Sequence, residues 1–304
     1  MTRLQKVSPL GAPFAELDGR VAYAGTMRFA KGHGTGNDFV VLPDLDGALA
    51  LNPVAIRALC DRRHGIGGDG VLRVVATAKV EGVAHLAGDA DWFMDYHNAD
   101  GTTAEMCGNG IRVYARWLQR LGLAGAGTLP VATRDGIKLV TLTDDEYGPI
   151  TVDMGAPQLP GNLRTVRVDG RTYDGLEVWM GNPHVVVSVA DLSDAGALVS
   201  APEIDPRLET NVEFVVQAGP GALSMRVHER GAGETQSCGT GACAAGVASA
   251  VWAGASNGSW TVDVPGGRLE VAWTGDTVLL TGPAEVVADG ELDFEWATSI
   301  GLLS

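Results

Sequence analysis

Two Cys-Gly-x-Gly turns, 131 residues apart, are the strongest chemical signal in the sequence: Cys107-Gly108-Asn109-Gly110 and Cys238-Gly239-Thr240-Gly241. A cysteine at the start of a helix lies near unpaired backbone N–H groups and the positive end of the helix dipole, and both favour the thiolate. The glycines let the backbone approach a ligand closely and offer N–H groups to a carboxylate. Each turn therefore supplies a candidate proton-transferring thiol and part of an anion site.

The two turns belong to an internal duplication. Residues 94–110 align without a gap on residues 225–241, with Met, His, Cys and both flanking glycines in register. Residues 36–41 resemble residues 181–186 in the same way, and each segment precedes the cysteine unit of its half. We therefore expect two halves of similar design with a ligand cleft between them, and two thiols that face it from opposite sides. Such an arrangement suits the movement of a proton across a molecule.

Other chemically capable residues are compatible with two interpretations. His184 follows a Gly-Asn-Pro turn and begins an apolar strand, so it is either a catalytic assistant or an ordinary strand-end histidine. Glu229 and Arg230 lie nine and eight residues before Cys238, where they either contact substrate or form a surface ion pair. Five asparagines at turns or strand starts are either turn formers or ligands for a zwitterion: Asn37, Asn98, Asn109, Asn182 and Asn211.

No metal or cofactor site is expected. The six histidines form no ligand pair, and the remaining cysteines, Cys60 and Cys243, are expected to be structural. The Gly-rich segment 63–70 lacks both the strand–GxGxxG–helix context and the Lys-Ser/Thr of a phosphate-binding loop.

Composition excludes several classes of function. A formal charge of −15 and a pI of about 4.7 argue against nucleic acid as a partner. Four cysteines in 304 residues are too few for a disulfide-stapled fold, and neither a signal peptide nor a membrane-spanning apolar stretch is expected. The sequence therefore predicts a cytoplasmic protein with reduced thiols, which acts on a small molecule.

The elements that position these residues are mostly strands. Short β-type runs separated by Gly, Asp and Pro turns are predicted at 39–42, 71–75, 92–96, 138–142, 150–154, 185–189, 212–216, 260–264, 268–273 and 277–280. Helical patterns are predicted only at 52–62, 111–121 and 242–252, and the last is apolar enough to be a buried central helix. Strands outnumber helices without alternating with them, which indicates an α+β fold. Residues 1–26 have no clear period and are expected to be a poorly ordered extension.

The motifs together resemble those of the diaminopimelate epimerase family, in the family's order, over roughly residues 28–285. The matching segments are 31–34, 37–39, 98–101, 107–110 with Arg112, 181–184, 211–213, 229–231 and 238–241. Position 70 is Gly, where a substrate-contacting Gln is often expected. The resemblance implies two pseudo-symmetric α+β halves, each a curved mixed or antiparallel sheet around a central helix, with the active site between them. Residues 27–150 with 284–304 would form the N-terminal half and 151–283 the C-terminal half.

The resemblance also implies a chemistry and the residues that perform it. The family converts LL-diaminopimelate to the meso isomer, in lysine and cell-wall precursor biosynthesis, without pyridoxal phosphate or metal, and is often dimeric. In that direction Cys238 corresponds to the proton acceptor and Cys107 to the donor, and His184 and Glu229 correspond to residues that assist them. Substrate contacts correspond to Asn37, Asn98, Asn182, Asn211, Glu229 and Arg230. Gly108-Asn109 and Gly239-Thr240 correspond to the paired helix starts that hold the reacting carboxylate.

Three alternatives stay open at this point. One is a cofactor-independent racemase for proline or hydroxyproline with the same fold, although Arg230 and the asparagines suit a substrate with a second amino-acid group. A second is a thiol-redox protein that uses Cys107 and Cys238 as a reversible disulfide. A third is a binding protein that has kept the cleft without turnover.

Overall fold

The chain is described by a computed structural model that covers residues 16–17, 20–21 and 27–303. The extension expected over residues 1–26 lies outside the described residues, apart from the short antiparallel pairing of β1 (Glu16–Leu17) with β2 (Arg20–Val21). Among the helices within the described ranges, none is long and apolar enough to cross a membrane.

One lobe is a curved sheet wrapped around helix α2 (Gly108–Arg120). Its neighbouring strands run in the order β20, β3, β4, β5, β6, β7, β8 and β9, and the pairs β4–β5 and β6–β7 are parallel. The strand bounds are β3 (Met27–Gly34), β4 (Asn37–Pro43), β5 (Gly70–Ala76), β6 (Trp92–Asn98), β7 (Gly127–Thr133), β8 (Gly136–Leu142), β9 (Ile150–Asp153) and β20 (Glu285–Leu292).

The other lobe repeats this plan around helix α3 (Gly239–Trp252). Its strands run in the order β10, β11, β12, β14, β15, β17, β18 and β19, and the pairs β12–β14 and β15–β17 are parallel. The bounds are β10 (Leu163–Val168), β11 (Arg171–Trp179), β12 (Pro183–Ser188), β14 (Asn211–Gly219), β15 (Ala222–Glu229), β17 (Gly258–Val264), β18 (Gly267–Trp273) and β19 (Val278–Gly282). Two short strands, β13 (Glu203–Asp205) and β16 (Gly233–Thr235), extend the sheet beside β10 and β15.

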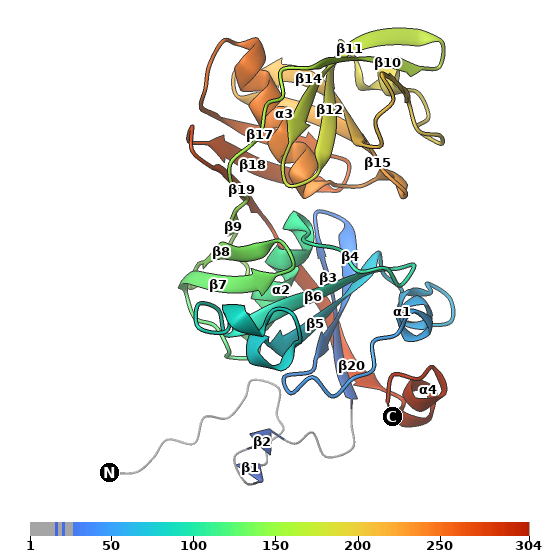
Figure 1. Cartoon of the computed structure of the whole chain (residues 1–304), viewed down its shortest axis with the longest axis vertical. Helices are drawn as coiled ribbons and strands as arrows, with labels where there is room; N and C mark the ends of the chain where they lie inside the picture. Colours follow the sequence, from blue (N-terminus) through green and yellow to red (C-terminus); the bar gives the residue numbers. More distant parts are fainter. Residues whose placement is uncertain (1–15, 18–19, 22–26, 304) are drawn as a thin grey trace.

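The two lobes are related strand for strand, because each has parallel pairs in its third and fifth positions. They lie one above the other in Figure 1, and the antiparallel pair β9–β19 joins them before β20 returns to the first lobe. This confirms the expected α+β class with two pseudo-symmetric halves. The boundaries expected from the sequence, 27–150 with 284–304 against 151–283, stay a prediction.

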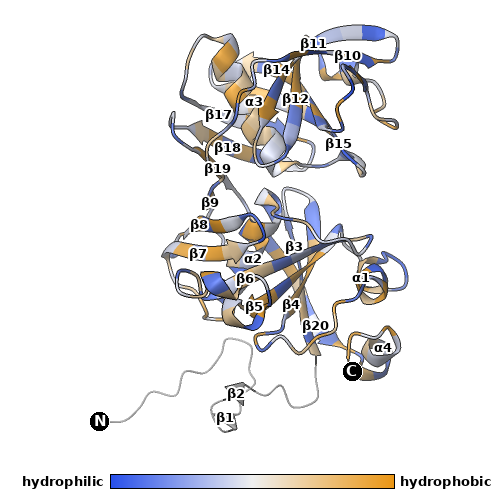
Figure 2. Cartoon of the chain, in the orientation of Figure 1, coloured by the Kyte–Doolittle hydropathy of each residue, from blue (hydrophilic) through white to orange (hydrophobic). Residues whose placement is uncertain are grey.

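Burial explains why the two central helices differ in composition from surface helices. Helix α3 is built almost wholly from small residues, and its hydrophobic character is visible in Figure 2. A Cβ added at Gly246 would lie 2.8 Å from the Val271 side chain, so the helix needs glycine to fit against β18. Helix α2 instead fills its lobe with large buried side chains, which include Tyr114 and Trp117.

Two further helices, α1 (Pro53–Cys60) and α4 (Phe294–Ser299), cover the outer face of the first lobe and share one apolar cluster with β4 and β5. Asn52 caps α1 by accepting hydrogen bonds from two backbone N–H groups, with Pro53 in the first turn, as expected for this sequence. Three single 3-10 turns complete the described elements: η1 (Thr77–Lys79), η2 (Ala84–Leu86) and η3 (Leu192–Ala195).

Candidate active site

The two cysteines of the duplicated turns are the N-cap residues of the two central helices. Their backbones are extended, with φ −141° and ψ 120° at Cys107 and φ −120° and ψ 115° at Cys238. Each Sγ accepts a hydrogen bond from the N–H group three residues on, at Gly110 and Gly241, with an N···S distance of 3.4 Å in both cases. Sulfur therefore occupies the place that a Ser, Asn or Asp oxygen usually takes at a helix start.

The starts of α2 and α3 lie against each other. A Cβ added at Gly239 would be 3.2 Å from Gly108 Cα and 3.3 Å from the Asn109 backbone nitrogen. The Asn109 side chain donates to the Ser237 carbonyl at 3.1 Å, and the Thr35 hydroxyl donates to the Ser237 hydroxyl at 2.6 Å, so both lobes hold this junction. Two positive helix-dipole ends converge here, which favours a bound carboxylate.

Burial and the groups near the Cys107 thiol have partly opposing effects on its pKa. Burial raises its pKa to about 11, and the Glu229 carboxylate contributes in the same direction. Backbone N–H groups of the helix start and the Arg112 guanidinium oppose this rise. The Sγ donates to Oδ1 of Asn37, the first residue of β4, at 3.6 Å.

The Cys238 thiol has a more acidic neighbourhood. Burial raises its pKa well above the ordinary value, and the carboxylates of Glu229 and Glu213 raise it further, against the Thr240 hydroxyl 3.5 Å away. Burial also raises the pKa of Glu229, although the Thr235 hydroxyl and the Cys238 thiol both donate to this carboxylate. The helix starts act in the direction expected from the sequence, but burial outweighs them and raises the pKa of both thiols.

His184 is fully buried and has a partner that the sequence analysis did not identify. Its Nδ1 lies 2.7 Å from Glu213 Oε1, and its Nε2 lies 2.9 Å from Asn182 Oδ1. Because β12 and β14 are parallel with His184 opposite Asn211, Glu213 falls two residues on, on the same face. A Cβ at Gly241 would lie 2.7 Å from Glu213 Oε1, so this pair packs against the first turn of α3.

A cavity of about 760 Å³ opens between the lobes beside these groups. Four residues expected at the site line it, two from each lobe: Asn37, Asn98, Glu229 and Arg230. The other lining residues include four charged side chains, Arg62, Asp69, Asp100 and Glu234. Cys107 and Cys238 are not among the lining residues, although Cys107 contacts the lining residue Asn37.

The remaining expected asparagines have protein partners and do not line this cavity. The Asn109 amide bridges the lobes and accepts from Arg112 Nη2 at 3.0 Å. Asn182 faces His184, and the Asn211 side chain accepts from the Arg230 backbone N–H at 2.9 Å. In this conformation, therefore, these three amides position other residues of the site.

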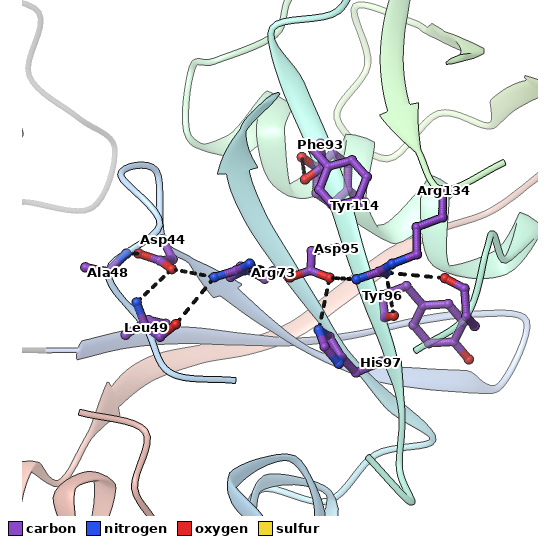
Figure 3. Close-up of polar contacts among 11 residues, drawn as sticks. Asp44, Ala48, Leu49, Arg73, Phe93, Asp95, Tyr96, His97, Tyr114 and Arg134 are labelled. Atoms are coloured by element: carbon purple, nitrogen blue, oxygen red, sulfur yellow. Dashed lines mark hydrogen bonds and ion pairs between the residues drawn. The ribbon is translucent and has the colours of Figure 1, made fainter. Parts of the chain in front are cut away.

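The loop that leads into Cys107 is held by a buried ion cluster on β5, β6 and the β7–β8 turn (Figure 3). Asp95 lies between Arg73 and Arg134, with His97 Nε2 3.0 Å from Asp95 Oδ1. Arg134 also donates to the backbone carbonyls of Tyr96, at 3.1 Å, and of Ala104 in the loop, at 3.4 Å.

Replacing Asp95 by Asn is expected to lower the free energy of unfolding by about 3 kcal/mol, because Arg73 and Arg134 lose the buried carboxylate between them and Arg73 keeps only the Asp44 carboxylate, 3.3 Å away. Burial raises the Asp95 pKa, but His97, Arg73 and Arg134 outweigh it and hold the pKa well below its usual range. The contribution is therefore present above about pH 4 and is lost as the pH falls. Urea denaturation at pH 7 measures the effect, with Asp89→Asn on the exposed surface as the control. Equal midpoints for the two variants would contradict this account.

Position 70 shows why this chain has glycine where a longer side chain was expected. A Cβ there would lie 2.5 Å from the His97 carbonyl and 2.7 Å from Tyr96 Cε2. The Tyr96 ring fills this space, packs edge-on against Phe39 with 5.9 Å between ring centroids, and lines the cavity. Tyr96 of β6 therefore occupies the space that a side chain at position 70 of β5 would need.

The two other cysteines are buried, as expected, and burial raises the pKa of each to about 12. Cys243 lies inside α3, whereas Cys60 ends α1 and contributes to the cavity wall. Within the part of the chain that the structure describes, no group of three or more His, Cys, Asp or Glu side chains is arranged to hold a metal ion.

Comparison with known proteins finds a match along most of the chain. A family model described as diaminopimelate epimerase matches residues 29–160 and 177–287. A diaminopimelate epimerase of Streptomyces coelicolor is 50% identical over 285 residues, which are 90% of this chain and 98% of that protein. One of Thermobifida fusca is 49% identical over 278 residues, which are 88% and 98% of the two chains.

Solved structures with the same fold are more distant in sequence. A hydroxyproline epimerase from Agrobacterium vitis superposes with a TM-score of 0.66 at 15% identity, over 92% of this chain and 96% of that one. A phenazine biosynthesis protein of the PhzF family from Bacillus anthracis superposes with a TM-score of 0.62 at 17% identity, over 88% and 99%. At these identities the similarity shows the fold alone.

Proposed function

Because this chain belongs to the diaminopimelate epimerase family, we propose that it interconverts LL- and meso-diaminopimelate by moving a proton across one α-carbon between Cys107 and Cys238. The observation that supports this most strongly is the junction of the two helix starts, each capped by one of the two thiols. This junction supports the proposal because it combines two thiols with two converging helix N-termini.

The proton balance of the reaction needs no other reagent. One sulfur, as thiolate, takes the proton from the α-carbon and becomes a thiol. The other, as thiol, gives its proton to the opposite face of the same carbon and becomes a thiolate, so the net charge of the pair is unchanged. In the LL-to-meso direction Cys238 accepts and Cys107 donates, and the roles exchange in the reverse direction.

The carbanion between these two steps needs electrostatic stabilisation, since the α-hydrogen of an amino acid is only weakly acidic. We propose that the N–H groups of Gly108-Asn109 and Gly239-Thr240 hold the reacting carboxylate, where negative charge accumulates. The substrate ammonium group brings a positive charge near the thiols, which lowers their raised pKa values and allows one to ionise. Closure of the lobes would remove water and strengthen both effects.

The supporting residues have separate roles in this proposal. Glu229 lies next to Cys238 and lines the cavity, so it contacts both a thiol and the substrate. His184 assists from within its lobe as the buried partner of Glu213. Asn37, Asn98 and Arg230, which line the cavity, bind the distal amino-acid group of the substrate. Asn182 and Asn211, which hold His184 and the Arg230 backbone, complete this set of substrate contacts when the lobes close.

We further propose that the enzyme requires no pyridoxal phosphate or metal and works in the cytoplasm as a homodimer, in lysine and cell-wall precursor biosynthesis. Like the assignment of individual site residues, these points follow from the family.

The function is tested by incubating the reduced protein with LL-diaminopimelate and separating the isomers by chiral chromatography. The expected result is an equilibrium mixture of LL and meso isomers, reached also from meso substrate, without added cofactor and in the presence of a chelator. Proline and hydroxyproline, tested in parallel, are expected to stay unchanged. If proline were racemised and diaminopimelate left unchanged, the protein would be a proline racemase. Activity that needs an electron acceptor would instead identify a thiol-redox protein.

A further inference from the structure

Arg112 is a buried cation immediately behind the paired helix starts. It lies on α2, five residues after Cys107, and is 0% exposed. Side chains of a helix lean toward its N-terminus, so the guanidinium returns to the first turn. There Nη1 donates to the Gly108 carbonyl and Nη2 to Asn109 Oδ1, both at 3.0 Å, while Nε donates to the Pro283 carbonyl at 3.3 Å.

The partners of Arg112 are all neutral. Among the ion pairs of the described residues none includes Arg112, and its hydrogen-bond acceptors are two backbone carbonyls and an amide oxygen. Burial lowers the Arg112 pKa to about 10, which leaves it charged at neutral pH. A buried charge without a counter-ion is costly. Its cost is offset when an anion binds nearby.

The surroundings of Cys107 and Cys238 differ in charge because the Arg112 guanidinium lies at the start of α2. Glu213 and Cys238 both pack against Gly241, and the carboxylates of Glu213 and Glu229 raise the pKa of the Cys238 thiol, whereas the Arg112 guanidinium lowers that of Cys107. Glu229 opposes Arg112 at Cys107 as well, but it acts on both thiols and therefore does not create the difference. The neighbouring Asn109 and Gly108 place the same guanidinium behind the proposed carboxylate site.

We propose that Arg112 is a positioning residue that supplies the positive charge of the paired helix starts, favouring the Cys107 thiolate and the bound carboxylate at once. This inference rests on the proposed function for its purpose, but the effect on Cys107 exists without substrate. It makes Cys107 the thiol that ionises first in the free enzyme. A purely mechanical role, holding the end of β19 and Pro283 against α2, is the alternative.

Arg116 provides a matched control on the same helix. It is 1% exposed and likewise donates to backbone carbonyls, those of Ala284, Asp145 and Gly148, and to the Gln119 side chain. It lies about one turn further from the thiols. Replacing either arginine by methionine removes a buried guanidinium from α2, so both variants lose mechanical support, but only one loses the charge at the helix start.

The test measures the rate of Cys107 alkylation by iodoacetamide against pH, with the modified cysteine identified by peptide mass spectrometry. Because the thiolate is the species that reacts, Arg112→Met is expected to shift the midpoint of the profile upward by about one pH unit. Below the midpoint this is a rate about tenfold lower than in the unmodified protein. Arg116→Met is expected to keep the original midpoint within about 0.3 unit.

If Arg112→Met does not fold, Arg112→Lys provides a second test of the charge at this position. It retains the charge and loses most of the hydrogen bonds, so it is expected to lower thermal stability while keeping the alkylation midpoint. A folded Arg112→Met with the original midpoint, or an Arg112→Lys with a shifted one, would overturn the inference. The outcome is independent of diaminopimelate turnover, so failure of the proposed function and failure of this inference are distinguished.

Discussion

Cys238→Ser is expected to lower the turnover of diaminopimelate on the order of 10³-fold in both directions, and Cys107→Ser to do the same. A serine hydroxyl keeps the N-cap hydrogen bond to the helix but ionises far less readily than a thiol, so each variant lacks one of the two proton-transferring groups. The structure should be preserved, because serine is a good N-cap residue. Turnover is followed from LL and from meso substrate by chiral chromatography.

Cys243→Ala is the control for the loss of a buried sulfur. Cys243 lies in α3 five residues after Cys238, and its side chain is fully buried. Since it has no place in the proposed proton transfer, turnover in this variant is expected to stay within about twofold, with a modest change in stability. If both serine variants were fully active, the two thiols would not be the proton-transferring groups.

The second large effect is expected at the junction of the helices. Gly239→Ala should lower kcat/KM by about 10- to 100-fold, because the new methyl group would lie 3.1 Å from Leu280 Cδ2 and 3.2 Å from Gly108 Cα. The helix starts must move apart, and a displacement of a few tenths of an ångström weakens every N–H contact to the carboxylate. Steady-state kinetics measures the loss, and thermal denaturation separates it from unfolding.

Gly125→Ala is the matched control, because a Cβ there meets nothing within 4 Å. Its kinetics are expected to equal those of the unmodified protein. Should Gly239→Ala be as active as Gly125→Ala, the reacting carboxylate is not held between the helix starts.

Much of this architecture was predictable from local sequence. Each of the ten expected strand segments overlaps an observed strand, with ends that agree to within three residues, since Gly, Asp and Pro turns separate many of them. The central helices begin three residues earlier than expected, at Gly108 and Gly239, because a Cys-Gly-x-Gly turn does not have the apolar period of a helix. Strands such as β10, β11 and β20 were not predicted, since about half of their residues are polar or glycine.

The site was predictable in its chemistry and less so in its contacts. The duplication placed both thiols at helix starts, which the structure confirms. Glu213 was missed as the partner of His184, because that contact depends on the parallel pairing of β12 with β14 and leaves no local pattern. Arg112 was predicted only as part of a motif, because its position in the sequence gives no sign that its charge is buried behind the helix start.

The central claim is that two different groups act on opposite faces of one carbon. We would follow the reaction of LL-diaminopimelate in D₂O by NMR at early times, with reduced protein and no cofactor. Two thiols predict deuterium at the α-carbon of the meso product, while the remaining LL substrate still carries hydrogen. Meso product that keeps the original hydrogen would mean that one group returns the proton it removed, and this would contradict the account.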